Sequence, residues 1–202
     1  MVTWSYSSIK TFDQCPRKYY HLKVARDVRD EGGVAAIYGQ EVHKAAENYV
    51  RDGVPVPDKF SFVEPVVSAF NNIPGEKHCE LKLGVRKTPN GYEPCEFFAK
   101  DVWWRGVADL LIINGGKAWL ADYKTGKSAK YADTKQLDLL AGAVFLHFPQ
   151  VKRIKSALAF VVINEFIKKN YDAGKEKECF SVFDHEISRL ETAHETGVWN
   201  PV

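Results

Sequence analysis

The sequence lacks the features that mark a membrane or secreted protein. No apolar run approaches the length needed to cross a bilayer, and the N-terminus MVTWSYSS has no apolar signal-peptide core. The four cysteines are scattered without a CxxC pair, which favours free thiols in a reducing compartment. We therefore expect a cytoplasmic protein that does not associate with membranes.

The chain also has little net charge, no internal repeat and no low-complexity segment. Its formal charge is +2, so a nucleic-acid-binding surface would have to concentrate its cations locally. A length of 202 residues and an apolar content of 45% are ordinary for a globular protein with one sizeable core. We expect a single domain over residues 1–202, with a helical part over about 1–75 and a sheet core over about 76–202.

The most informative stretch is a predicted hairpin that carries charges inside apolar strands. The turn Asn114-Gly115-Gly116 suits a tight hairpin, and Asp109, Asp122 and Lys124 lie in the strands on either side of it. The two strands are predicted over residues 103–113 and 118–124. Charged side chains are rarely buried unless they are paired or bound to metal, so these three need a reason to be there.

The spacing of these charges favours a metal site. Asp122 and Lys124 are two residues apart on a strand and share a face, while Asp109 lies near them on the neighbouring strand. Two carboxylates beside one ammonium group suit Mg²⁺ or Mn²⁺ and the hydrolysis of a phosphodiester. The alternative is a buried ion pair, which is costly without a ligand.

The acid-x-Lys pattern by itself is weak evidence. The chain holds three instances, at Glu80-Leu81-Lys82, Asp122-Tyr123-Lys124 and Asp133-Thr134-Lys135. The second instance alone has an apolar strand before it, a glycine after it and another acid on the partner strand.

The arrangement resembles the PD-(D/E)XK nuclease superfamily, and most closely its RecB-like branch of phage and CRISPR-adaptation exonucleases. The resemblance rests on Asp109, on Asp122-Tyr123-Lys124 and on Gln136-Leu137 at the start of a helix. Ser7-Ser8-Ile9, Cys15-Pro16 and the helix start Gly39-Gln40-Glu41-Val42-His43 extend it upstream, in the family's order, over nearly the whole chain. It implies an α/β restriction-endonuclease-like fold with a mixed central β-sheet flanked by α-helices, which agrees with the predicted order of elements.

The resemblance also implies roles for individual residues. Lys124 would orient the nucleophilic water, with Glu80 and Gln136 assisting. The metal, Mg²⁺ or Mn²⁺, would be bound by His43, Asp109, Asp122 and the Tyr123 carbonyl. Without the resemblance, a lone helical histidine is more often structural, and Glu80 could equally be an exposed strand charge.

Two groups of basic and aromatic residues are candidate DNA contacts. The first is Arg17, Lys18 and Tyr19 in a predicted helical segment, and the second is Lys127, Lys130 and Tyr131 in the loop after the catalytic strand. Such residues can follow phosphates and stack on bases. Each group could also be an ordinary solvated surface.

Related RecB-like nucleases often hold a [4Fe–4S] cluster through one early cysteine and three late ones. Cys15 matches the early position, but the sequence contains no later trio. We therefore expect no iron–sulfur cluster in this chain.

The expected function is a metal-dependent deoxyribonuclease, an exonuclease of phage or bacterial recombination, replication or repair. Its partner would be DNA, single- or double-stranded, with a recombination or single-strand-binding protein as a further candidate. One alternative is a DNA-binding module that kept the fold and lost catalysis, and the intact Asp109, Asp122 and Lys124 argue against it. Another is a metal enzyme acting on a different phosphate ester. The oligomeric state stays open.

Overall fold

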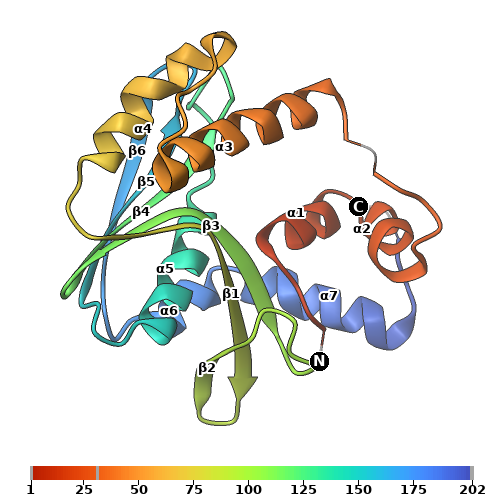
Figure 1. Cartoon of the computed structure of the whole chain (residues 1–202). Helices are drawn as coiled ribbons and strands as arrows, with labels where there is room; N and C mark the ends of the chain where they lie inside the picture. Colours follow the sequence, from red (N-terminus) through yellow and green to blue (C-terminus); the bar gives the residue numbers. More distant parts are fainter. Residues whose placement is uncertain (1, 31, 201–202) are drawn as a thin grey trace.

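The computed structural model describes residues 2–30 and 32–200, which fold around one six-stranded sheet (Figure 1). The strand order is β2-β1-β3-β4-β5-β6. Neighbouring strands are antiparallel except β4 and β5, which are parallel, so the sheet is mixed as predicted. The strands are β1 Glu76–Thr88, β2 Gly91–Cys95, β3 Trp104–Asn114, β4 Lys117–Lys124, β5 Arg153–Phe160 and β6 Glu165–Asp172.

Helices cover both faces of the sheet (Figure 1). They are α1 Tyr6–Gln14, α2 Pro16–Tyr19, the π-helix η1 Tyr20–Ala25, α3 Val34–Asp52, the 3₁₀ helix η2 Asp58–Val63, α4 Glu64–Asn71, α5 Lys135–His147, α6 Glu176–Ser181 and α7 Asp184–Thr196. Within the described residues, none of them is long and apolar enough to cross a bilayer.

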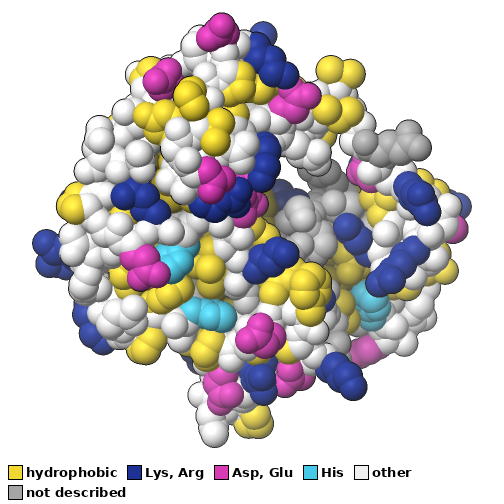
Figure 2. Space-filling view, in the orientation of Figure 1, with side chains coloured by type: hydrophobic (Ala, Val, Ile, Leu, Met, Phe, Trp, Pro, Cys, Tyr) yellow, Lys and Arg dark blue, Asp and Glu magenta, His cyan; other side chains and the backbone are white. Residues whose placement is uncertain are grey.

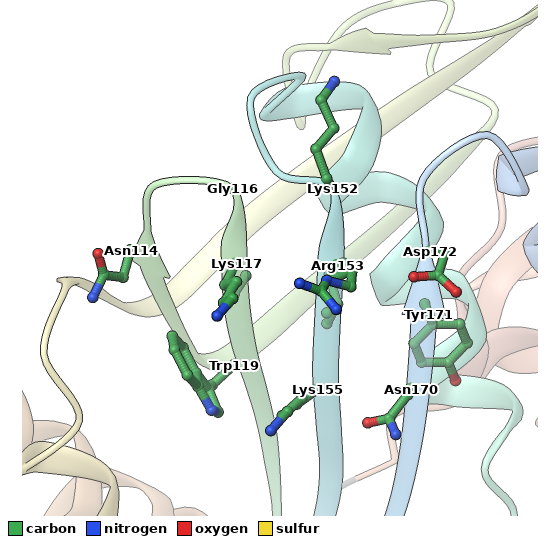
Figure 3. A pocket seen from close by; sticks show the side chains of 12 residues that line it. Asn114, Gly116, Lys117, Trp119, Lys152, Arg153, Lys155, Asn170, Tyr171 and Asp172 are labelled. Atoms are coloured by element: carbon green, nitrogen blue, oxygen red, sulfur yellow. The ribbon is translucent and has the colours of Figure 1, made fainter.

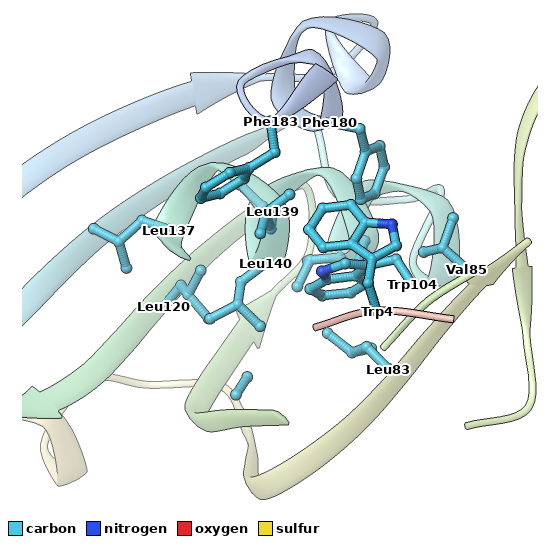
Figure 4. Close-up of a cluster of buried hydrophobic side chains, with 14 of the residues drawn as sticks. Trp4, Leu83, Val85, Trp104, Leu120, Leu137, Leu139, Leu140, Phe180 and Phe183 are labelled. Carbon is cyan, nitrogen blue, oxygen red and sulfur yellow. The ribbon is translucent and has the colours of Figure 1, made fainter. Parts of the chain in front are cut away.

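Two apolar clusters fill the space between the sheet and these helices. One lies under α3 and α4, and the other lies under α1, α5, α6 and α7. In the second, the indoles of Trp4 and Trp104 pack with Phe180 and Phe183 against α5 (Figure 4). Helix α5 is buried from Leu137 to Phe145, a stretch that is apolar except for Asp138 and Gly142.

The two predicted hairpin strands are present with shifted ends. The strand predicted over 103–113 forms as β3, one residue later, and the one predicted over 118–124 begins one residue earlier, as β4. The N-cap of α1 is Ser5, because the Ser5 and Ser8 side chains exchange hydrogen bonds with each other's backbone N–H.

Strands β3 and β4 separate towards one end. Their pairing runs from Asn114–Lys117 to Leu110–Ala121 and stops there, whereas β4 continues beside β5 to Lys124. Further along, the free edge of β3 is occupied by the N-terminal segment, because Trp4 donates its N–H to the Trp103 carbonyl and accepts from the Arg105 N–H. Asp109 and Asp122 each lie one residue beyond the last β3–β4 pair.

At the level of Asp109, the side chains of β1 and β3 change from one face of the sheet to the other. The paired residues Cys79 and Leu110 pack under α3 and α4, whereas the next pair in the register, Leu81 and Ala108, packs under α5. Residues two apart share a face in a regular strand, so this exchange needs a break in the backbone. Glu80 supplies it with a left-handed φ of +52°, a conformation that costs a side-chain-bearing residue about 1–2 kcal/mol. The break lies beside Asp109.

Candidate metal centre

The separation of β3 and β4 leaves the Tyr123 backbone without partners on β3, and two site side chains replace them. The Tyr123 N–H donates to Asp109 Oδ2 at 2.7 Å. The Tyr123 carbonyl accepts from His43 Nε2 at 2.9 Å. Because unpaired backbone groups are costly to bury, these two bonds fix Asp109 and His43 where the strands part. Helix α3 is thereby held against the end of β4.

Three potential ligands converge at this point. One ligand atom from each of His43, Glu80 and Asp109 lies within 4.8 Å of the others, and His43 Nδ1 is 3.4 Å from Asp109 Oδ2. Burial lowers the pKa of His43, but the hydrogen bond and charge of Asp109 outweigh it, so the pKa is raised. Burial, followed by the charge of Asp109, raises the pKa of the Glu80 carboxyl.

Asp122, Lys124 and Gln136 form a second group beside the first. Lys124 Nζ lies 2.6 Å from Asp122 Oδ2 and donates to Gln136 Oε1 at 2.8 Å. The contact with Asp122 is an ion pair between the Lys124 ammonium and a buried carboxylate oxygen. Burial and then the charge of Asp109 raise the pKa of Asp122 to about 6, against the opposing charge of Lys124.

This donor set fits a divalent cation. Carboxylates held together without a cation repel one another and raise each other's pKa, as Asp109 does to Glu80 and Asp122. Carboxylate oxygens and an imidazole suit Mg²⁺ or Mn²⁺. Glu80 lies in the close group with His43 and Asp109, while Asp122 lies beside it with its Oδ2 buried against Lys124.

Comparison with known proteins agrees with this geometry. Residues 3–177 match the sequence profile of the PD-(D/E)XK nuclease superfamily. The chain belongs to this superfamily. A search of the curated proteins found no match.

Two solved structures share the fold of this chain. The first is the crystal structure of SSO0001, which has 15% sequence identity to this chain and a TM-score of 0.51. The alignment covers 92% of this chain and 75% of the SSO0001 chain. A "Putative exonuclease" from Eubacterium rectale shares 13% identity over 98% of this chain and 82% of its own, with a TM-score of 0.54. Identities this low show a shared fold alone.

The candidate DNA contacts occupy different environments. Arg17 and Lys18 are exposed, but Tyr19 is 3% exposed and lies between Phe12 and Trp199, with ring centroids 5.6 and 5.9 Å away. A base could stack on Tyr19 only by displacing one of these rings. Sequence reasoning had no means of seeing this burial, because Trp199 is distant in the chain.

The loop after β4 is open to solvent near the acids. Tyr131 is 86% exposed, and Lys130 Nζ lies 5.1 Å from the centre of its ring. Lys127 is exposed in the same loop, three residues after Lys124. These three side chains are free to meet a ligand that approaches the centre.

A further basic and aromatic surface, on the strands that also carry Glu80 and Asp109, escaped the sequence analysis. Phe98 is 75% exposed, and Lys82 Nζ and Arg105 Cζ lie 5.7 and 5.9 Å from the centre of its ring. Lys82 is two residues from Glu80 on β1, and Arg105 is four residues from Asp109 on β3. The adjacent aromatics Phe97-Phe98 in a polar stretch were the available signal.

The face of the molecule is hollowed between α3 and the α1–α2 pair, and Lys and Arg side chains gather around the hollow (Figure 2). On the α3 side, His43 and Glu80 help to line a cavity of about 460 Å³. Near α1, a cavity of about 670 Å³ is lined by residues that include Lys23, Arg26 and Arg29. An anionic ligand entering this hollow meets cationic side chains.

Comparing Glu80→Gly with Glu80→Ala should distinguish the effect of backbone strain on stability from the effect of the carboxylate. Both changes remove the charge, but only Gly removes the penalty for a positive φ. We expect Glu80→Gly to be more stable than Glu80→Ala by about 1–2 kcal/mol in urea unfolding. Equal stabilities would show that the left-handed backbone stores no strain.

The raised pKa of Asp122 should appear in the pH dependence of stability without metal. The folded state holds this proton up to about pH 6, whereas an unfolded aspartate releases it near pH 4. Asp122 therefore makes stability fall as the pH rises between these values, because the folded state binds more protons. Urea unfolding in EDTA should show that fall in the wild type relative to Asp122→Asn. Parallel pH profiles would contradict the assignment.

Proposed function

We propose that this chain is a divalent-metal-dependent deoxyribonuclease, an exonuclease of the RecB-like branch. The convergence of His43, Glu80, Asp109, Asp122 and Lys124 where β3 and β4 separate is the observation that carries the proposal. We take residues 1–202 as one nuclease domain, acting in the cytoplasm in phage or bacterial recombination, replication or repair. A recombination or single-strand-binding protein is the candidate partner.

The proposed mechanism assigns the cation to the acidic side of the centre. His43, Glu80, Asp109 and Asp122, with the Tyr123 carbonyl, are the groups that would hold it. When bound, Mg²⁺ or Mn²⁺ polarises a phosphate and lowers the pKa of water. The imidazole must be neutral to bind a metal, so binding would release the proton that Asp109 stabilises on His43.

Lys124 is the side chain that supplies positive charge to the proposed reaction. Its ammonium is held by Asp122 and Gln136, so its position is fixed before substrate arrives. There it can orient the attacking water or stabilise the negative charge that develops on the phosphate. Gln136 acts in this scheme through Lys124, as a positioning residue.

Cations and exposed aromatics around the centre support a polynucleotide substrate. Phe98, with Lys82 and Arg105 over its ring, combines a flat face with two cations, the combination that binds unpaired bases and their phosphates. This favours a single strand or a frayed end at the centre. The printed name of the Eubacterium rectale protein, "Putative exonuclease", agrees with the proposed exonuclease activity.

The deciding experiment is digestion of end-labelled single- and double-stranded linear DNA beside a closed circle, each with Mg²⁺, Mn²⁺ or EDTA. An exonuclease degrades the linear DNA with metal and spares the circle. Cleavage of the circle would indicate an endonuclease. DNA binding without cleavage by either metal would indicate a module that has lost catalysis.

Lys124→Ala should abolish cleavage and leave metal binding largely intact, because the ammonium is not a ligand. Asp109→Ala and Asp122→Ala should lose both. Isothermal titration with Mn²⁺ measures the binding, and circular dichroism establishes that each variant is folded. Normal Mn²⁺ affinity in Asp122→Ala would remove Asp122 from the ligands.

Phe98→Ala should raise the KM for single-stranded DNA and leave Mn²⁺ affinity unchanged, because Phe98 is exposed and would stack on a base. Loss of one stacked base corresponds to about 1–3 kcal/mol. Phe98→Tyr is the matched control, since it keeps the flat ring and should keep the wild-type KM. An unchanged KM in Phe98→Ala would exclude the stacking role.

A further inference from the structure

A groove lies on the sheet at the opposite end of β4 from the acids. A cavity of about 800 Å³ and a neighbouring one of about 440 Å³ share Trp119, Lys155 and Asn170. Together they form one depression along β4, β5 and β6 beside α4, the β4–β6 groove (Figure 3). The groove is separate from the metal centre because none of His43, Glu80, Asp109, Asp122 and Lys124 lines either cavity, and its far end at Lys117 is six residues from Tyr123, about 20 Å along the strand.

The side chains of the groove form a regular array because the strands are in register. Lys117 is paired with Arg153, Trp119 with Lys155, and Lys155 with Asn170. Neighbouring strands are about 4.8 Å apart, and successive residues on one face are about 6.6 Å apart. Figure 3 shows these side chains side by side on the three strands.

The groove concentrates positive charge. Five cationic side chains line it against the single carboxylate of Asp172, so it carries +4 where the whole chain carries +2. The cations are Lys117, Lys152, Arg153, Lys155 and Lys168. Within the described residues, none of the five forms an ion pair. Clustered cations without counter-charges repel one another, and a polyanion relieves that repulsion.

The groove also offers flat and apolar contacts. Trp119 is half-buried between the cations, and Phe70 of α4 and Ile73, just after its end, form part of the wall. An acidic peptide would satisfy the cations, but an indole between cations also provides a surface for a base. In a duplex the bases are stacked inside the helix and cannot reach an indole on the groove floor.

We propose that the β4–β6 groove binds single-stranded nucleic acid, with phosphates on Lys117, Arg153 and Lys155 and a base on Trp119. The site goes beyond the proposed nuclease function because binding there needs neither the metal nor Lys124. It would hold a strand outside the catalytic cleft, and a second attachment point raises the effective concentration of the remaining strand at the centre.

The first test measures binding of a fluorescein-labelled oligothymidine strand in EDTA at several salt concentrations. Arg153→Gln/Lys155→Gln should bind more weakly, with a salt dependence of log affinity shallower by about 1.4, because two phosphate contacts are lost. Lys87→Gln/Lys177→Gln is the matched control, since it removes the same charge from exposed lysines outside the groove. Equal losses in both double variants would overturn the proposal.

The second test uses the tryptophan fluorescence of the chain itself. Trp4, Trp103 and Trp104 are each at most 2% exposed, so Trp119 and Trp199 are the indoles within a ligand's reach. Oligothymidine should quench the wild type more than Trp119→Phe, which keeps an aromatic ring for packing and leaves Trp199 as the indole in reach. Equal quenching of the two proteins would exclude a base on Trp119.

Two outcomes separate this site from its alternatives. Displacement of oligothymidine by polyglutamate at equal charge concentration would assign the groove to an acidic protein instead. Cleavage of an oligonucleotide too short to span both sites should be unchanged in Arg153→Gln/Lys155→Gln. The groove can therefore be shown to bind nucleic acid even if the chain is not a nuclease. Likewise, the chain can be shown to be a nuclease even if the groove does not bind nucleic acid.

Discussion

The candidate metal centre depends on the separation of β3 and β4 beyond the Leu110–Ala121 pair. A continuous ladder would satisfy the Tyr123 backbone with β3 and leave no space between the strands. Because the ladder stops, Asp109 and His43 bond that backbone instead, and the same side chains become potential ligands. The N-terminal segment then occupies the β3 edge further along, which limits the gap to the level of the acids.

The centre is organised at the expense of local stability. Glu80 adopts a left-handed backbone, and Asp122 is buried with a pKa raised to about 6. Strained backbones and unneutralised acids cluster at functional sites because the surrounding fold holds them in place. Here the two apolar clusters hold them, since α3 and α5 pack on opposite faces of the strands that carry the acids. A bound cation would offset part of the repulsion.

Charge distribution matters more than net charge in this molecule. A formal charge of +2 suggests no affinity for nucleic acid, yet cations gather around the hollow, around Phe98 and in the β4–β6 groove. Membership of the nuclease superfamily indicates the type of reaction. The basic surfaces would instead select the kind of nucleic-acid strand and the path along which it binds.

The sequence by itself determined the hairpin with Asp109, Asp122 and Lys124, the order of the elements and the family resemblance, because turn residues, alternation and spacing are local. Only the tertiary structure decided that Glu80 joins His43 and Asp109, that Trp199 covers Tyr19, and that Lys82 and Arg105 lie over Phe98. The array of the β4–β6 groove also depends on the parallel pairing of β4 with β5 across α5. These facts arise from contacts between segments distant in the chain, whose register no local pattern specifies.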